Sequence, residues 1–400
     1  MQTKAFDIVV VGAGVVGLAV ARELLQRNPR ARIAVLDKEA EAGRHASGRN
    51  SGVVHCGIYY APNTLKAKVC VEGARRMLAF AESEGIPYRQ GGKVILGVND
   101  QDASAIERLL GNAAASGIPA ERIDSRRLRE LEPFAAPTAA AIHCPTTAVI
   151  DSRAVLSRLK DRLLEKGVEF HMPCSFERLV GPGRIQTSGG QFSYGFLFNC
   201  AGAYADVVAH AYGLGKEFAF VPFKGMYWRL SDAASSKVRS NIYPVPDPAM
   251  PFLGVHLTRV VSGDVYAGPT AIPAFGRENY GVVQGLNMAE TVTIGYRVAK
   301  MYLRNRNNFR ALAHAEMGKY LKPRFLAATQ KLVPSLTSED LVPSKKVGIR
   351  PQLVHKGKGT LEMDYVLLRG ERELHVLNAI SPAFTGAFVF AEMIADQANL

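Results

Sequence analysis

The sequence GAGVVG near the N-terminus is the feature that most constrains how this chain folds. A short apolar run precedes it and predicts a buried strand, and an alanine- and leucine-rich segment follows it and predicts a helix. In a dinucleotide-binding βαβ unit, Gly12 permits the tight turn, Gly14 lets the backbone approach a pyrophosphate, and Gly17 lets the helix pack closely on the strand. The helix N-terminus attracts the pyrophosphate through its free N–H groups, here beside Val15 and Val16.

An acidic residue at the end of the next predicted strand strengthens this interpretation. Residues 32–36 (RIAVL) predict that strand, and Asp37 follows it about 20 residues after the last glycine, where the fingerprint places an acid for a ribose hydroxyl. Lys38 comes directly after it and is a further candidate for cofactor binding. The pattern predicts a dinucleotide site but does not choose between FAD, NAD and NADP.

Composition limits the class of partner. The chain has 400 residues, enough for two or three domains, with 48% hydrophobic and 21% charged residues. Lysine plus arginine exceeds aspartate plus glutamate by 49 − 36 = 13, which favours an anionic partner: a nucleic acid, a membrane surface or an acidic substrate. No nucleic-acid-binding motif occurs in the sequence, so we expect no nucleic acid.

The cysteine pattern and the apolar runs indicate the kind of protein to expect. The five cysteines are scattered without a CxxC pair, so we expect neither a disulfide framework nor a metal site. No apolar run reaches the length of a membrane span, and the first five residues leave no room for a signal peptide. We therefore expect a cytoplasmic protein.

The segment at residues 41–60 (EAGRHASGRNSGVVHCGIYY) is rich in small residues and has no helical period. Such a loop beside a dinucleotide fold predicts backbone packed against a large flat ligand. Its candidate cofactor-binding residues are Ser47, Arg49, Asn50, Ser51 and Gly52. His55 in the same loop fits either a buried structural histidine or a cofactor-binding or catalytic group.

GAGVVG and the later stretch ASGRNSGVVHCGIYYAPNTLKAKVCVEG together resemble the FAD-dependent L-2-hydroxyglutarate dehydrogenase/oxidase family of D-amino-acid-oxidase-type flavoproteins. The shared features are an Asn-Ser-Gly sequence, a histidine, a Tyr-Tyr pair and a Leu-Lys-Ala-Lys segment, here Asn50-Ser51-Gly52, His55, Tyr59-Tyr60 and Leu65-Lys66-Ala67-Lys68. The resemblance implies FAD as the cofactor. It also implies an α/β fold in which a Rossmann-like FAD-binding domain is interrupted by an α+β substrate domain with a mostly antiparallel sheet.

Two later segments extend the resemblance along the chain. A second strand followed by an Ala-Gly turn, here Ala201-Gly202, passes back over the FAD in such flavoproteins. The family's closing motif, Asn-Ala-x-Ser-Pro followed by small residues and Thr, implies further FAD contacts from Ser381, Pro382, Ala383 and Thr385. The implied domains are 1–82, 146–218 and 341–400 for FAD, and 83–145 and 219–340 for substrate.

A histidine in a predicted strand is our favoured catalytic base. His256 lies in PFLGVHLTR, and its face of that strand is shared with Gly254 and Thr258. Oxidation of an alcohol needs a base with a pKa near neutrality, because the hydroxyl proton leaves as hydride departs. We favour His256 over His55 for this role and keep both, with Tyr60 as a further catalytic candidate.

Cationic residues are the candidates for binding substrate carboxylates. Arg350 lies in a Gly-Ile-Arg sequence that the family also carries, and Arg259 follows the strand histidine. The family has Pro-Phe-Arg-Gly-Glu-Tyr where this chain has Pro-Phe-Lys-Gly-Met-Tyr. Lys224 therefore keeps a charge but lacks the planar fork of arginine, and Met226 lacks the acid.

The stretch at residues 297–331 is strongly basic, with aromatic residues and leucines interleaved. It fits a pair of helices with a solvated basic face, and it also fits docking on an anionic membrane, which would suit electron delivery to quinone. Oxygen and quinone both remain open as electron acceptors.

The resemblance implies oxidation of L-2-hydroxyglutarate to 2-oxoglutarate by hydride transfer from Cα to flavin N5. The alternative within enzymes is a flavin-dependent oxidase or dehydrogenase of another small acid, an amino acid or glycerol 3-phosphate. A third hypothesis is a basic membrane- or nucleic-acid-bound protein whose flavin is structural.

Overall fold

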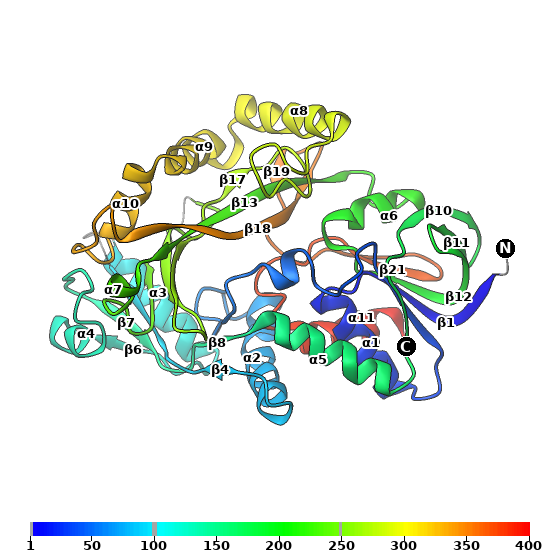
Figure 1. Cartoon of the computed structure of the whole chain (residues 1–400), viewed down its shortest axis with the longest axis horizontal. Coiled ribbons are helices and arrows are strands. Elements are labelled where there is room, and N and C mark those ends of the chain that lie inside the picture. Colours follow the sequence, from blue (N-terminus) through cyan, green and yellow to red (C-terminus); the bar gives the residue numbers. More distant parts are fainter. Residues whose placement is uncertain (1–2, 98–101, 248–249) are drawn as a thin grey trace.

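The computed structural model describes residues 3–97, 102–247 and 250–400 and divides into two halves along its long axis (Figure 1). Within these residues, the half that holds both termini is built on an eight-stranded sheet. Its strands are β1 (Lys4–Val11), β2 (Ile33–Leu36), β9 (Glu169–His171), β10 (Phe176–Gly181), β11 (Arg184–Thr187), β12 (Gly190–Asn199), β20 (Leu367–Arg369) and β21 (Glu373–Val376). A parallel core runs in the order β9, β2, β1, β12, β21.

Helices cover both faces of this sheet. The larger layer comprises α1 (Val15–Arg27), α2 (Leu65–Ser83), α5 (Ser152–Glu165) and α11 (Ala387–Ala398), which share one apolar core with Ile8 and Val10 of β1. Val9 and Val11 point to the opposite face, where α6 (Ala205–Ala211) packs. β1 is therefore buried on both faces, as its apolar run predicted.

The glycine-rich turn joins β1 to α1 through close backbone contacts. Gly12 has a φ of +111°, and a Cβ added there would lie 2.3 Å from the carbonyl oxygen of Cys200. A Cβ on Gly17 would lie 1.9 Å from the carbonyl oxygen of Gly12. A side chain on Gly12 would therefore push the turn away from the end of β12. A side chain on Gly17 would push α1 away from the turn.

The other half is built on a ten-stranded sheet. Its strands are β5 (Lys93–Leu96), β6 (Glu121–Ile123), β7 (Ala141–Cys144), β13 (Phe218–Leu230), β14 (Asn241–Pro244), β15 (His256–Arg259), β16 (Val265–Gly268), β17 (Ile272–Pro273), β18 (Leu341–His355) and β19 (Thr360–Leu361). The pairs are antiparallel except β5 with β14. The predicted fold class, a Rossmann-like part combined with a mostly antiparallel one, is confirmed.

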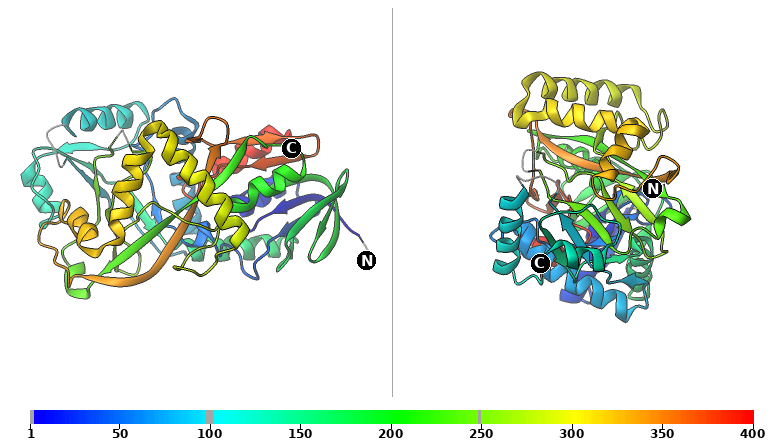
Figure 2. Two further views of the ribbon diagram at one scale, coloured as in Figure 1. Left: turned by 90° about the horizontal axis from the view of Figure 1, so that it is seen from above. Right: turned by 90° about the vertical axis from the view of Figure 1, so that its left-hand side faces the viewer.

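The remaining elements cover or connect the two sheets. α8 (Met288–Arg304), α9 (Phe309–Met317) and α10 (Lys322–Gln330) form a layer over β13 and β18 (Figure 2). A small sheet of β3 (Val53–Val54), β4 (Tyr88–Arg89) and β8 (Ala148–Ile150) lies between the halves. The remaining helices are α3 (Asp102–Ala115), α4 (Ser125–Leu131), α7 (Asp232–Ser235), η1 (Ala46–Gly48), η2 (Gly202–Tyr204), η3 (Arg306–Asn308) and η4 (Gly318–Tyr320).

The predicted domain boundaries stay a prediction. One of them, at residue 341, does not agree with how the strands pair. The prediction groups residues 341–400 with the FAD-binding domain. β18, at residues 341–355, instead pairs along its length with β13 in the ten-stranded sheet. Backbone hydrogen bonds with β13 therefore tie this strand to the half predicted to bind substrate.

The contact of α2 with the turn before α11 generates a prediction about stability. A Cβ on Gly73 would lie 2.4 Å from the Cα of Gly386. We expect Gly73→Ala to lower the free energy of unfolding by about 1–3 kcal/mol, because two backbones must separate. Gly111→Ala in α3 is the matched control, since its Cβ meets nothing within 4 Å, and should raise stability by up to about 1 kcal/mol. Urea unfolding measures both; equal stabilisation by the two alanines would contradict the contact.

Candidate active site

One elongated cavity of about 700 Å³ extends from the glycine-rich turn to the ten-stranded sheet. Both halves of the molecule line it. The predicted cofactor residues that line it are Gly12, Gly14, Val15, Val16, Asp37, Lys38, Ser47, Arg49, Asn50, Ser51, Ala201, Gly202, Ser381, Pro382, Ala383 and Thr385. Gly17 and Gly52 lie outside this lining, and a Cβ on Gly52 would lie 2.7 Å from the carbonyl oxygen of Ile150.

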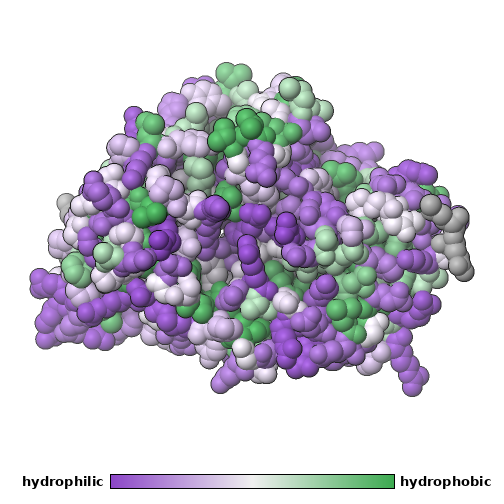
Figure 3. Space-filling model, in the orientation of Figure 1, coloured by the Kyte–Doolittle hydropathy of each residue, from purple (hydrophilic) through white to green (hydrophobic). Residues whose placement is uncertain are grey.

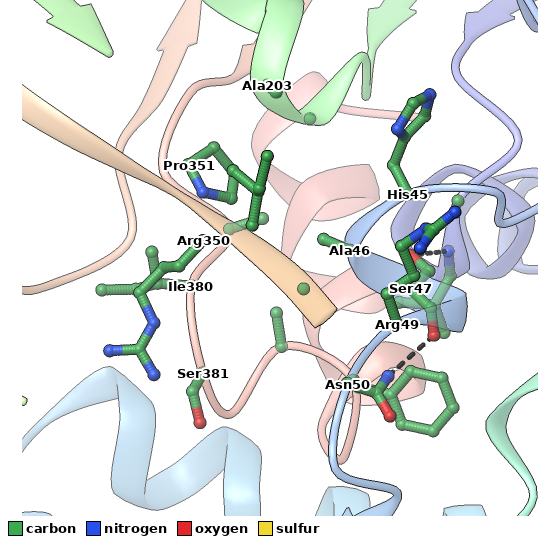
Figure 4. A pocket seen from close by; sticks show the side chains of 18 of the residues that line it. His45, Ala46, Ser47, Arg49, Asn50, Ala203, Arg350, Pro351, Ile380 and Ser381 are labelled. Atoms are coloured by element: carbon green, nitrogen blue, oxygen red, sulfur yellow. Dashed lines mark hydrogen bonds between the residues drawn. The ribbon is translucent and has the colours of Figure 1, made fainter. Parts of the chain in front are cut away.

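The glycine-turn end of the cavity has the polar groups that a dinucleotide needs. Asp37 accepts hydrogen bonds from the N–H groups of Ala13 (2.7 Å) and Glu39 (2.9 Å), while burial raises the pKa of its carboxyl. Ser47 Oγ accepts from the N–H of Val15 at the start of α1 (3.0 Å), and Asn50 donates to the Ser47 carbonyl (2.7 Å; Figure 4). A helix N-terminus and an acid at the end of β2 fit a pyrophosphate and a ribose.

A segment between β17 and α8 reaches across to this end of the cavity, and we call residues 276–284 the strap. Arg277 forms ion pairs with Asp206 (Nη1–Oδ1 2.6 Å) and Glu290 (Nε–Oε1 2.9 Å). Tyr280 lies with its hydroxyl 2.8 Å from His45 Nδ1, and the Arg49 guanidinium lies 4.1 Å from the Tyr280 ring centroid. The strap therefore links the two halves beside the nucleotide end.

Lys38 is held in an ion-pair network with the strap. Its Nζ lies 2.5 Å from Glu278 Oε1 and 2.9 Å from His45 Nε2, and it also pairs with Glu39. Ligand atoms of Glu39, His45 and Glu278 lie within 4.8 Å of one another, a spacing that a metal ion could bridge. The Lys38 ammonium bonds to all three, so we assign them to a salt-bridge network.

At the opposite end of the cavity, His256 is presented by β15. Its ring stacks on Tyr243 at 4.0 Å, and its Nδ1 donates to the carbonyl oxygen of Gly254 (2.9 Å). Nε2 is then the nitrogen with the free lone pair. Burial, assisted by the positive charges of Lys93 and Arg350, lowers the pKa of His256 to about 4. The ring is therefore neutral at neutral pH and able to accept a proton.

His55 lines the same end and is tied to the closing turn. Its backbone N–H donates to Thr385 Oγ1 (3.2 Å), which connects the end of β3 to the residues before α11. Burial lowers the pKa of the His55 ring to about 3. Two neutral histidines thus share this end of the cavity, and the pKa of each lies below the near-neutral value that we expected of the base.

Arg350 extends from β18 into this end of the cavity (Figure 4). Across the described parts of the chain, no carboxylate forms an ion pair with its guanidinium. Its neighbours are Phe252, whose ring centroid lies 4.9 Å away, and the phenols of Tyr60 and Tyr227. Burial lowers the pKa of Arg350, yet its side chain stays charged, so this end of the cavity fits an anion.

Two other predicted carboxylate-binding residues do not line the cavity. Arg259 alternates with Thr258 along β15, so it points away from the face of His256, and its guanidinium donates to the carbonyls of Ser235 (2.9 Å) and Val238 (3.0 Å). The alternation of side chains along the predicted strand already indicates that Arg259 and His256 face opposite sides.

Lys224 is separated from Arg350 by the same alternation. Phe223, its neighbour in β13, pairs with Arg350, so Lys224 lies on the other face of the sheet. Its Nζ donates to Asn279 Oδ1 (3.1 Å) and to the carbonyl oxygen of Gly281 (2.6 Å). Lys224 therefore anchors the strap.

Sequence reasoning missed a buried lysine behind His256. Lys93 is 1% exposed, and its Nζ lies 4.3 Å from the ring centroid of Tyr59 and 5.1 Å from that of Tyr243. Among the described residues its Nζ has no hydrogen-bond partner. The register places it opposite Asn241 on the strand that also carries Tyr243, so its charge lies behind the ring that supports His256. A single lysine in a short apolar strand gives no sequence signal for this role.

The parallel sheet, the glycine-rich turn and the continuous cavity define a dinucleotide-binding oxidoreductase with a second, antiparallel part. The model for the DAO family, described as FAD dependent oxidoreductase, matches residues 7–397. The chain belongs to this family, which confirms FAD as the predicted cofactor.

Relatives with similar sequences cover nearly the whole chain. An L-2-hydroxyglutarate dehydrogenase of Indibacter alkaliphilus is 35% identical over 404 residues, covering 98% of this chain and 98% of the relative. The L-2-hydroxyglutarate dehydrogenase of Escherichia coli strain K12 is 35% identical (98% and 93% covered). The mitochondrial L-2-hydroxyglutarate dehydrogenase of Homo sapiens is 34% identical (99% and 89% covered).

Solved structures share the fold at lower identity. An FAD-bound L-alpha-glycerophosphate oxidase from Mycoplasma pneumoniae superposes with a TM-score of 0.79 at 20% identity, covering 100% of this chain and 96% of that one. A glycine oxidase from Geobacillus kaustophilus gives a TM-score of 0.73 at 17% identity, with 99% and 95% covered.

The ion pair between Arg277 and Asp206 generates a prediction about the strap. Asp206 is 2% exposed, so Arg277→Met would leave a buried carboxylate without its cation. We expect a loss of about 3 kcal/mol in the free energy of unfolding and weaker retention of FAD, measured by urea unfolding and by flavin release on gel filtration. Arg229→Met is the control, because Arg229 pairs with the exposed Asp232, and should leave both unchanged. Equal effects of the two variants would contradict the assignment.

Proposed function

We propose that this chain oxidises L-2-hydroxyglutarate to 2-oxoglutarate with FAD as the cofactor. The observation that carries the proposal is that a neutral His256 and Arg350 line one end of a cavity whose other end fits a dinucleotide. Among the described residues, Arg350 has no carboxylate partner. A 2-hydroxy acid needs both groups: a base for its hydroxyl and a cation for the adjacent carboxylate. The named relatives, at 34–35% identity over nearly the full chain, support the choice of L-2-hydroxyglutarate.

In the proposed reaction, the Arg350 fork binds the C1 carboxylate and so fixes the hydroxyl-bearing carbon. His256 Nε2 accepts the hydroxyl proton, because Nδ1 is committed to the Gly254 carbonyl. FAD, when bound, would supply the two-electron acceptor for the hydride that leaves Cα. The O–H and C–H bonds break as the C=O bond of 2-oxoglutarate forms. His55 is the alternative base, and Tyr60 borders the same site.

Other residues would hold the cofactor in place. The turn at residues 12–17 and the start of α1 would bind the pyrophosphate, and Asp37 would bind a ribose hydroxyl. Residues 47–51 would lie along the flavin, and the turn at residues 381–385 would close over it. The cavity is lined by residues from each of these segments, which supports the arrangement.

An anaerobic substrate screen tests the proposed reaction. The flavin absorbance of the holoenzyme should bleach with L-2-hydroxyglutarate and persist with its D-enantiomer. Bleaching with an amino acid or glycerol 3-phosphate instead would favour the alternative oxidase function. Colour that persists with every acid would favour a structural flavin.

The role of His256 generates a prediction about pH. His256→Asn should lower kcat/KM by about 10²–10⁴-fold while the flavin spectrum is retained. Because its pKa is lowered to about 4, the base is unprotonated at pH 5–8, and activity is lost only as pH falls toward 4. Steady-state kinetics from pH 4 to 8 measure this limb. A limb at or above pH 6.5 in the wild type, or a larger loss in His55→Asn than in His256→Asn, would contradict the assignment.

We also propose that the α8 layer docks on an anionic membrane surface, with quinone rather than oxygen as electron acceptor. The exposed apolar residues of α8 recur on one helical face: Met288, Val292, Tyr296 and Leu303. Val282 and Val283, just before α8, are 91% and 75% exposed. Figure 3 shows apolar surface at the upper edge, where Figure 1 places α8.

Basic residues of the predicted stretch adjoin this apolar face. Arg304, Arg306 and Arg310 are exposed at and beyond the end of α8. Apolar insertion combined with nearby cations is the pattern of peripheral attachment to anionic lipid. Within the described residues, no helix is long and apolar enough to cross a bilayer. We therefore propose a cytoplasmic protein that attaches peripherally to the inner face of the membrane.

The docking face generates a prediction about vesicle binding. The double variant Val292→Asp, Leu303→Asp should cosediment about tenfold less with phosphatidylserine vesicles, because charge replaces two inserting side chains. Leu164→Asp is the control, since Leu164 is an exposed leucine of α5 in the other half. Both proteins should keep anaerobic flavin reduction. Undiminished cosedimentation of the double variant would contradict docking through α8.

A further inference from the structure

We call the end of the cavity lined by His256, His55 and Arg350 the substrate end. A buried lysine of α2, Lys66, lines this end beside Arg350. Lys66 is 8% exposed, whereas the flanking Leu65 and the nearby Lys68 are exposed. Its Nζ donates to the carbonyl oxygen of Met363, which lines the same cavity, and lies 6.0 Å from the ring centroid of Tyr60. The sequence predicts Lys66 in a helix with an exposed charged face. Its burial results from contacts with residues distant in sequence, such as Met363.

Lys66 carries a positive charge that no ion pair among the described residues neutralises. No carboxylate lies within ion-pair distance of its Nζ in the part of the chain that the structure describes. Burial and the positive charge of Arg350 lower the pKa of Lys66 to about 8, and Asp364 opposes them. Lys66 is thus mostly protonated at neutral pH, and two cations, Lys66 and Arg350, line this end of the cavity, with the Lys93 ammonium behind them. Two cations in one half-buried site are unfavourable unless an anion joins them.

We propose that Lys66 binds the distal carboxylate of a dicarboxylic 2-hydroxy acid while Arg350 binds the carboxylate next to the hydroxyl. This inference rests on the proposed function and deepens it, because it names the group that selects a second carboxylate. Arg259 and Lys224, the other predicted carboxylate-binding residues, are committed to backbone and strap contacts away from the cavity. Lys93 lies against the rings of Tyr59 and Tyr243 and does not line the cavity. Among the described residues, Lys66 is therefore the cation beside Arg350 that is available for the second charge.

This arrangement defines a specificity. L-2-hydroxypentanoate has the chain length of L-2-hydroxyglutarate but ends in a methyl group, so it would leave the Lys66 ammonium without a counter-charge. A site built around a charged group rejects a ligand that lacks the partner much more strongly than an apolar pocket does. We infer that the enzyme prefers dicarboxylates through Lys66.

The test compares both substrates in the holoenzyme of the wild type, Lys66→Met and Lys68→Met. In Lys66→Met, KM for L-2-hydroxyglutarate should rise about 30-fold or more while kcat changes by less than about fivefold, because binding is lost and the chemical step is kept. Its preference for L-2-hydroxyglutarate over L-2-hydroxypentanoate, as the ratio of kcat/KM values, should fall at least about tenfold. Lys68→Met removes an exposed lysine from the same helix and should match the wild type.

A purely structural role for Lys66, tying α2 to Met363, gives a different result. Lys66→Met would then lower kcat/KM for both substrates alike, with a lower unfolding midpoint or loss of flavin, and this would overturn the inference. Lys66→Arg, which keeps the charge, should restore most of the preference; no restoration would also count against it.

A binding measurement separates this inference from the proposed function. If the wild type does not oxidise L-2-hydroxyglutarate at all, the proposed function fails. Glutarate, which has both carboxylates but no hydroxyl, then tests Lys66 through its perturbation of the oxidised flavin spectrum. Its Kd should rise about 30-fold or more in Lys66→Met, and an unchanged Kd would overturn the role of Lys66.

Discussion

The guanidinium of Arg350 lies in a half-buried site where the protein offers it aromatic rings and phenols but, among the described residues, no acid. Removing a cation from water is unfavourable unless an anion replaces the lost solvation. The rest of the substrate end is consistent with this one charge. Lys66 adds a second cation to the lining of this end, and the imidazole of His256 stays neutral beside them.

Each half of the molecule contributes what the other lacks. The eight-stranded sheet supplies the glycine-rich turn, α1 and Asp37, which fit a dinucleotide but include no base for an alcohol. The ten-stranded sheet supplies His256 on β15 and Arg350 on β18, and the strap joins it to the nucleotide end through Arg277. A cofactor held by the first half is thereby brought against a substrate held by the second.

Sequence alone predicted the features that depend on local pattern. The glycine-rich turn, Asp37 and the buried β1 follow from spacing and apolar runs over a few residues. His256 was chosen for its place in a predicted strand and the need for a base, and the resemblance supplied Arg350 and the two-part fold. We predicted Arg259 and Lys224 at the site because of their charge. Side chains alternate along β15 and β13, however, so Arg259 faces away from His256 and Lys224 faces away from Arg350. The strap and Lys66 could not be predicted, because their positions depend on contacts between segments distant in sequence.

The most direct measurement is the anaerobic reduction of the flavin by L-2-hydroxyglutarate, followed by stopped flow in the wild type and in Arg350→Met. The concentration dependence of the observed rate gives the Kd of the substrate and the limiting rate of reduction. With Arg350 as the carboxylate partner, the variant should show a Kd about 100-fold higher or more, equivalent to about 2.7 kcal/mol of lost binding. An unchanged Kd would contradict the proposed role of Arg350, because its guanidinium would then have no part in binding the substrate carboxylate.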